Sequence, residues 1–93
     1  MKDTRHKKNR WQVYLLKCCD NTLYCGITSD LNKRLLDHNS GKGARYTRGR
    51  GPLTLVAKSP LMNKSQALRL EIKVKKQRAA KKIDVLKDGI KEE

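Results

Sequence analysis

Two short apolar segments, WQVYLLKC at residues 11–18 and TLYCGI at residues 22–27, decide the fold of this chain. Both segments are rich in aromatic, β-branched and aliphatic side chains, which favour β-strands. The residues between them, CDN at 19–21, bring the turn-forming chemistry of Asp and Asn. The sequence therefore predicts an antiparallel β-hairpin at which the structured part of the chain begins.

The length of the hairpin turn decides which side chains share a face of the sheet. Side chains alternate along a strand, so a shift of one residue moves Tyr24 to the face opposite Tyr14. A two-residue turn gives that arrangement. A three-residue turn, with Asn21 near the left-handed region, instead pairs Tyr24 with Leu16 and Tyr14 with Gly26. We predict the three-residue turn or an equivalent bulge, with both phenols on one face.

A helix and a third strand are expected after the hairpin. Ser29 and Asp30 offer N-cap oxygens, and Gly41 supplies a stop, so a helix of about three turns is expected between them. Residues 39–52 contain too many glycines to be regular and form a basic loop. Residues 53–58 have the composition of a strand.

The second half of the chain is expected to be mainly helical. Asn63 and Gln66 have the spacing of a capping box, which starts a helix that reaches about Arg78. Helical character continues beyond it until the Asp88-Gly89 pair. The order ββαβα predicts an α/β fold, with a small three-stranded, mostly antiparallel sheet flanked by helices.

Length and cysteine content limit the domain organisation and the compartment. Ninety-three residues allow one compact domain, which we assign to residues 11–88, after a basic flexible arm at 1–10 and before a tail at 89–93. Cys18, Cys19 and Cys25 are odd in number and lack metal-site spacing, so we expect small core residues without a disulfide partner. A reducing, cytoplasmic location fits them best.

The charge balance points to a polyanionic partner. The chain has 23 Lys and Arg against 9 Asp and Glu, a formal net charge of +14, which makes nucleic acid the first candidate. An anionic membrane surface or a scaffold role has only this charge in its favour. Apolar runs fall short of the roughly 20 residues of a spanning helix, and residues 1–10 are too polar for a signal peptide. We therefore expect no membrane partner.

Helical periodicity places charged side chains among apolar ones in both expected helices. Arg34 and His38 share an inward arc with Leu31 and Leu35 in the first helix. Glu71 falls within a broad apolar arc of the second helix formed by Ala67, Leu68, Leu70, Ile72 and Val74. A buried carboxylate needs a partner, and two options remain open: a structural ion pair with Arg34, or a divalent metal ion.

Five of these positions resemble the motif pattern of a known enzyme family. The segments QVY at 12–14 and YCG at 24–26 look like the paired motifs that name the GIY-YIG nucleases. Arg34 and His38 follow at the spacing of the family pattern, and Glu71 matches its metal-binding glutamate on a later helix. The resemblance covers residues 11–78 and looks closest to the short stand-alone bacterial members.

The resemblance implies a metal-dependent endonuclease that hydrolyses a phosphodiester bond of DNA, with structure-specific repair or recombination as its setting. Glu71 would anchor Mg²⁺ or Mn²⁺, while waters and a phosphate oxygen complete the coordination. Tyr14 would orient or deprotonate the attacking water, tuned by Tyr24 and His38. Arg34 would hold the phosphate and stabilise developing negative charge. The family also has a late Asn or Gln, for which Gln77 is the loose counterpart.

The basic loop has two interpretations, a DNA-contacting surface or a solvated face. Its cations can bind successive phosphates, and its aromatic ring can stack on an unpaired base. The residues that we assign to nucleic-acid binding are Lys42, Arg45, Tyr46, Arg48 and Arg50. The alternative function is a non-catalytic module that binds DNA, RNA or the ribosome, which has the same charge in its favour. The single domain also leaves room for an additional protein that supplies substrate specificity.

Overall fold

A three-stranded antiparallel sheet forms the centre of the computed structural model, which describes residues 9–43 and 47–91. Its strands are β1 (Gln12–Lys17), β2 (Leu23–Thr28) and β3 (Thr54–Lys58), in the order β2-β1-β3. Both strand pairs are antiparallel, and β1 lies between the other two. The expected α/β class and three-stranded sheet are confirmed.

The hairpin has the predicted register. Tyr14 pairs with Gly26 and Leu16 pairs with Tyr24. Asn21 has a φ of 67°, the left-handed conformation that the three-residue turn requires. The Tyr14 and Tyr24 side chains therefore project from the same face of the sheet, and their ring centroids lie 6.2 Å apart.

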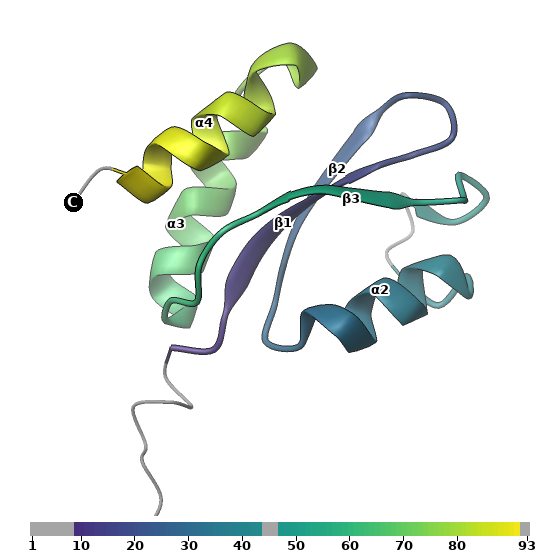
Figure 1. The fold of residues 1–93 in the computed structure, drawn as a ribbon, viewed down its shortest axis with the longest axis horizontal. Helices are drawn as coiled ribbons and strands as arrows, with labels where there is room; N and C mark the ends of the chain where they lie inside the picture. Colours follow the sequence, from purple (N-terminus) through teal and green to yellow (C-terminus); the bar gives the residue numbers. More distant parts are fainter. Residues whose placement is uncertain (1–8, 44–46, 92–93) are drawn as a thin grey trace, which may run out of the picture.

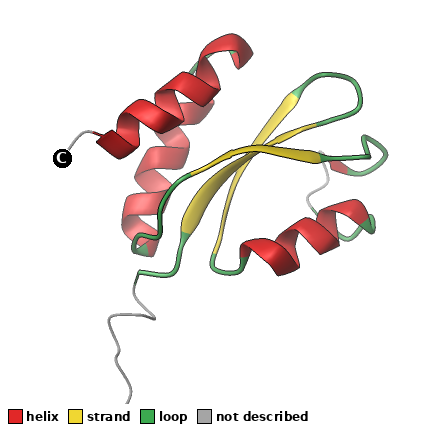
Figure 2. Cartoon of the chain, in the orientation of Figure 1, coloured by secondary structure: helices red, strands yellow, loops and turns green. Residues whose placement is uncertain are grey.

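Helices cover both faces of the sheet. Helix α2 (Leu31–Asn39) lies on one side, whereas α3 (Lys64–Lys75) and α4 (Ala79–Lys91) lie on the other (Figure 1). Figure 2 shows the strands, in yellow, as one twisted layer between the red helices. Asp30 caps α2, and the predicted capping box of Asn63 and Gln66 begins α3.

Two alternating sets of side chains along β1 produce two small cores. Val13 and Leu15 pack with α3 and α4, while Tyr14 and Leu16 pack with residues of α2 and the loop before β3. All four side chains are fully buried. This central strand therefore fixes α2 and the α3–α4 pair relative to each other, and it carries Tyr14 into the interior of the α2 face.

The second half of the chain differs from the expected boundaries. Helix α3 ends at Lys75, before Arg78, and a separate helix α4 continues through Asp88-Gly89 as far as Lys91, so the element order is ββαβαα. The fully buried Leu86 and its packed neighbour Ile83 anchor α4 on the sheet. We attribute the longer helix to this packing, because tertiary burial outweighs the roughly 1 kcal/mol by which a glycine disfavours a helix interior.

Three residues expected in the core are exposed. Leu68 and Ile72 on α3 are 41% and 55% exposed, because the helix buries a narrower face than the sequence indicates, one that contains Ala67 and Val74. Cys19 is exposed because it belongs to the hairpin turn, whereas Cys18 and Cys25 are buried as expected.

Most of the predicted basic arm, positions 1–8, and the last two residues of the predicted tail lie outside the described residues, whereas positions 89–91 belong to α4. Within the described ranges, no helix is both long enough and apolar enough to cross a membrane.

Candidate functional site

Three side chains from three elements meet on the α2 face of the sheet. Tyr14 comes from β1, Tyr24 from β2 and His38 from the last turn of α2. The His38 ring centroid lies 5.8 Å from that of Tyr14 and 5.3 Å from that of Tyr24, edge-on to both. The inward arc predicted for α2 is thus confirmed at His38, which is 3% exposed.

A buried chain of hydrogen bonds passes through His38. The Tyr14 hydroxyl lies 2.9 Å from His38 Nε2, and His38 Nδ1 lies 2.9 Å from the Thr47 hydroxyl. Thr47 is itself 2% exposed. Both ring nitrogens of His38 are therefore engaged, which holds the imidazole in one orientation. Sequence analysis missed Thr47, because nothing in the glycine-rich loop distinguishes this threonine from its neighbours.

The electrostatic surroundings keep Tyr14 and His38, the two titratable groups of this series of hydrogen bonds, uncharged at neutral pH. Burial raises the pKa of Tyr14 to about 12; the adjacent Arg34 guanidinium opposes this rise and Tyr24 adds to it. Burial also lowers the pKa of His38 below its usual 6.5, and the positive charge of Arg34 lowers it further, against an opposite effect of Asp37. A neutral phenol and a neutral imidazole therefore lie side by side, next to a permanent cation.

Two glycines make this packing possible. A Cβ atom at Gly26 would lie 2.7 Å from the Tyr14 hydroxyl and 2.9 Å from the Tyr24 ring. A Cβ atom at Gly43 would lie 2.2 Å from His38 Nδ1. All three distances are too short for any other residue type without a shift of the ring concerned. The glycine of the YCG segment is therefore needed by the tyrosines that flank it.

We predict that Gly26→Ala displaces the Tyr14 phenol without unfolding the protein. The added methyl group overpacks a buried site, which typically costs about 1–3 kcal/mol of unfolding free energy. Thermal unfolding should show this moderate loss, and the nuclear magnetic resonance signals of the Tyr14 and His38 rings should shift. An alanine variant with wild-type stability and unchanged ring signals would contradict the close approach.

Glu71 lies on the other side of the sheet from the tyrosines. Its side chain on α3 is 16% exposed and forms an ion pair with Lys75, one turn later, at 3.2 Å between Oε2 and Nζ. The partner that the structure provides is therefore Lys75 and not Arg34, which lies beside Tyr14 on the α2 face. Sequence analysis missed Lys75, although its i,i+4 spacing from Glu71 is the usual signal for such a pair.

The donor set around Glu71 fits a hard divalent cation held by few protein ligands. A carboxylate oxygen suits Mg²⁺ or Mn²⁺, and Mg²⁺ usually keeps several waters and accepts phosphate oxygens. Among the residues that the structure describes, no cluster of three or more His, Cys, Asp and Glu side chains is present. A site at Glu71 would therefore be of the single-carboxylate kind that the sequence analysis expected.

The remaining expected site residues are dispersed. Lys42 and Arg48 are exposed, as DNA contacts would need, whereas Arg50 pairs with Asp20 of the hairpin turn. Arg45 and Tyr46 lie outside the described residues. Gln77 lies in the turn between α3 and α4, where its backbone NH donates to the Val74 carbonyl.

Residues 10–84, which include the sheet, helix α2 and the candidate site residues, match the model of the GIY-YIG catalytic domain. The chain belongs to the GIY-YIG family, whose nuclease character implies a nucleic-acid substrate.

Relatives and solved structures agree with this assignment. The chain is 46% identical over 76 residues to a UPF0213 protein of Nitratidesulfovibrio vulgaris, covering 82% of this chain and 69% of that protein. The match to a UPF0213 protein of Vibrio cholerae spans 65% of the length of that relative. The solution structure of the UPF0213 protein of Bacillus halodurans, 44% identical, superimposes with a TM-score of 0.51 over 83% of this chain and 82% of that one.

Proposed function

We propose that this chain is a metal-dependent endonuclease that hydrolyses phosphodiester bonds of DNA. The observation that carries the proposal is the buried Tyr14–His38–Thr47 chain of hydrogen bonds beside Arg34. A module that only bound nucleic acid would need exposed cations, but it would gain nothing from a neutral imidazole held against a phenol. Family membership supports hydrolysis, and the net charge of +14 supports a polyanionic substrate.

Tyr14 and His38 together can remove a proton from the attacking water. In the tautomer with the proton on Nδ1, His38 donates to the Thr47 hydroxyl and accepts the Tyr14 hydroxyl proton at Nε2. Tyr14 would take a proton from the water while its own proton passes to His38, so a phenolate need not form. The water oxygen then bonds to phosphorus, and the bond to the leaving oxygen breaks.

Arg34 and Glu71 would serve the phosphate in different ways. The Arg34 guanidinium can donate two parallel hydrogen bonds to phosphate oxygens as negative charge develops on them. A divalent cation held by Glu71, Mg²⁺ or Mn²⁺, would supply charge neutralisation at the phosphate and at the leaving oxygen. Glu71, which pairs with Lys75 in the structure, is the residue that would hold this cation.

The decisive experiment is cleavage of labelled DNA by the pure protein. Duplex, flap and branched substrates would be incubated with Mg²⁺, with Mn²⁺ and with a chelator. We expect metal-dependent cuts, and a preference for flap or branched DNA would point to a repair or recombination role. Tight binding without cleavage of any substrate under all conditions would favour the non-catalytic module instead. The buried free thiols of Cys18 and Cys25 support a reducing, cytoplasmic location for the protein, and reducing assay conditions would match it.

We further predict that DNA binding depends strongly on salt and only weakly on sequence, because phosphate contacts dominate it. The double replacement of Lys42 and Arg48 by alanine should flatten the dependence of log affinity on log salt by about one to two units. Anisotropy titrations from low to high salt would measure this slope. Replacement of Arg69 and Lys81, which are equally exposed on the helices, is the charge-matched control. Equal slopes for both double variants would mean that the loop is only solvated surface.

A further inference from the structure

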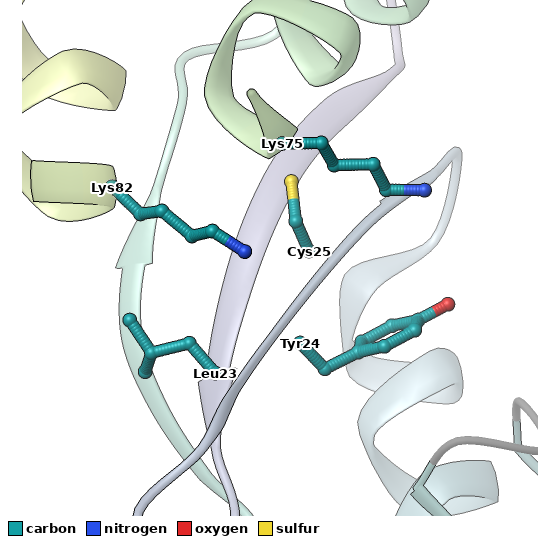
Figure 3. A pocket seen from close by; sticks show the side chains of 5 residues that line it. All are labelled: Leu23, Tyr24, Cys25, Lys75 and Lys82. Atoms are coloured by element: carbon teal, nitrogen blue, oxygen red, sulfur yellow. The ribbon is translucent and has the colours of Figure 1, made fainter. Parts of the chain in front are cut away.

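A pocket of about 370 Å³ lies at the free edge of the sheet, next to the candidate catalytic residues. It is lined by residues of β2, α3 and α4, namely Leu23, Tyr24, Cys25, Lys75 and Lys82. Figure 3 shows the two lysine side chains reaching in from their helices on either side of the Cys25 sulfur. Tyr24 belongs both to this pocket and to the ring cluster with His38, so the two sites adjoin.

The pocket holds an excess of positive charge. Lys75 has Glu71 as its ion-pair partner, but within the part of the chain that the structure describes Lys82 has no ion pair. The Cys25 thiol does not supply the missing negative charge, because burial raises its pKa to about 11, with a further rise due to Glu71 that both lysines oppose. The lysines therefore face a neutral sulfur, and two ammonium groups at one pocket favour an anion.

Metal binding would increase this excess. A divalent cation at Glu71 would compete with the Lys75 ammonium, which lies 3.2 Å from Oε2 of the carboxylate. The released ammonium would then lie beside Lys82 and the new cation with no carboxylate of its own. Like charges that line one pocket repel each other, and a bound anion would offset this repulsion. The ligand that restores neutrality has to be anionic and has to lie next to the metal.

We propose that this pocket binds a phosphodiester group of the DNA strand that neighbours the scissile phosphate, through the ammonium groups of Lys75 and Lys82. The inference rests on the proposed nuclease function and extends it to a second phosphate subsite. Consecutive phosphates along one strand would then meet Arg34 on the α2 face and the two lysines, with the neighbouring Glu71, on the other face of β2. Lysine ammonium groups, which lack the paired donors of an arginine guanidinium, suit the second phosphate because it needs only to be held in place.

Replacement of Lys82 by methionine tests the pocket without disturbing Glu71. Methionine keeps a long apolar side chain and removes the charge. Lys81→Met is the matched control, because the adjacent Lys81 is exposed and does not line the pocket. With a fluorescein-labelled duplex in the presence of a chelator, we expect Lys82→Met to weaken binding about five- to tenfold and to flatten the salt slope by about one unit. Lys81→Met should weaken binding less than about twofold, and Lys82→Arg should restore most of the affinity.

Chemical-shift mapping by nuclear magnetic resonance locates the contact between the pocket and DNA directly, even if the Lys82→Met variant folds poorly. On titration of the wild-type chain with a short oligonucleotide, we expect shifts of the backbone amides of Leu23, Cys25 and Lys82. Equal affinities of Lys81→Met and Lys82→Met, or amide shifts confined to the α2 face, would overturn the subsite and leave cleavage unaffected. Pocket binding without cleavage by any metal would instead overturn the nuclease proposal and leave the subsite intact.

Discussion

Glu71→Gln is expected to remain folded, to bind DNA and to lose metal-dependent cleavage by at least about a thousandfold. Replacing residues that merely support a metal ligand typically costs roughly 10- to 100-fold, so loss of the ligand itself should cost more. The amide has the shape of the carboxylate but not the negative charge that a hard cation requires. Cleavage of labelled flap DNA at several Mn²⁺ concentrations measures the activity, and circular dichroism of the same samples measures the folding.

Lys75→Met, assayed at saturating DNA because Lys75 is also a proposed phosphate ligand, separates the metal role of Glu71 from a structural role of its ion pair. This variant also removes the Glu71–Lys75 pair but leaves the carboxylate free for a cation. If the ion pair matters only for stability, Glu71→Gln and Lys75→Met should unfold at the same lower temperature and show similar losses of cleavage activity. Lys75 is 53% exposed and the pair has i,i+4 helix spacing, which argues for a small stability effect, of about 0–1 kcal/mol. Glu71→Gln that still cuts DNA at the wild-type rate would exclude Glu71 from the reaction.

The hairpin could be predicted from the sequence because local rules determine it. The alternation of side chains and the conformational tolerance of Asn21 admit one turn length that puts both tyrosines on one face, and the observed register has it. The arc of α2 that contains Arg34 and His38 follows in the same way from helical periodicity. These positions form the part of the site on the α2 face, so the sequence alone predicts that part.

Contacts between distant segments could not be predicted from the sequence. Thr47 reaches His38 only because a loop folds back over α2 at Gly43, and no local pattern indicates that approach. Lys82 lines the pocket only because α4 packs on the sheet through Leu86, a contact that no local pattern indicates. Gln77, chosen from its sequence position, lies in an interhelical turn. In each case the position of the residue depends on tertiary packing and not on a local signal.

Tyr14→Phe should lower the rate of cleavage by about a thousandfold, within the roughly 10²- to 10⁴-fold range of general acid–base contributions, and leave DNA affinity within a few fold. Phenylalanine fills the same buried volume, but it has no hydroxyl to donate to His38 Nε2. The ring packing with Tyr24 remains, so the variant should fold. Single-turnover cleavage and equilibrium binding with the same labelled DNA separate the two effects.

The pH dependence of cleavage distinguishes proton transfer through His38 from simple positioning. His38 can accept a proton only while it is neutral, and burial lowers its pKa, so the wild-type rate should decline at a lower pH than an ordinary histidine would give. Because the pKa of Tyr14 is about 12, its ionisation should cause no change between pH 7 and about 10. In His38→Gln the acid decline should disappear together with most of the activity, since an amide can hydrogen-bond to the phenol but cannot take its proton. A His38→Gln enzyme that keeps full activity would reduce the histidine to a packing residue.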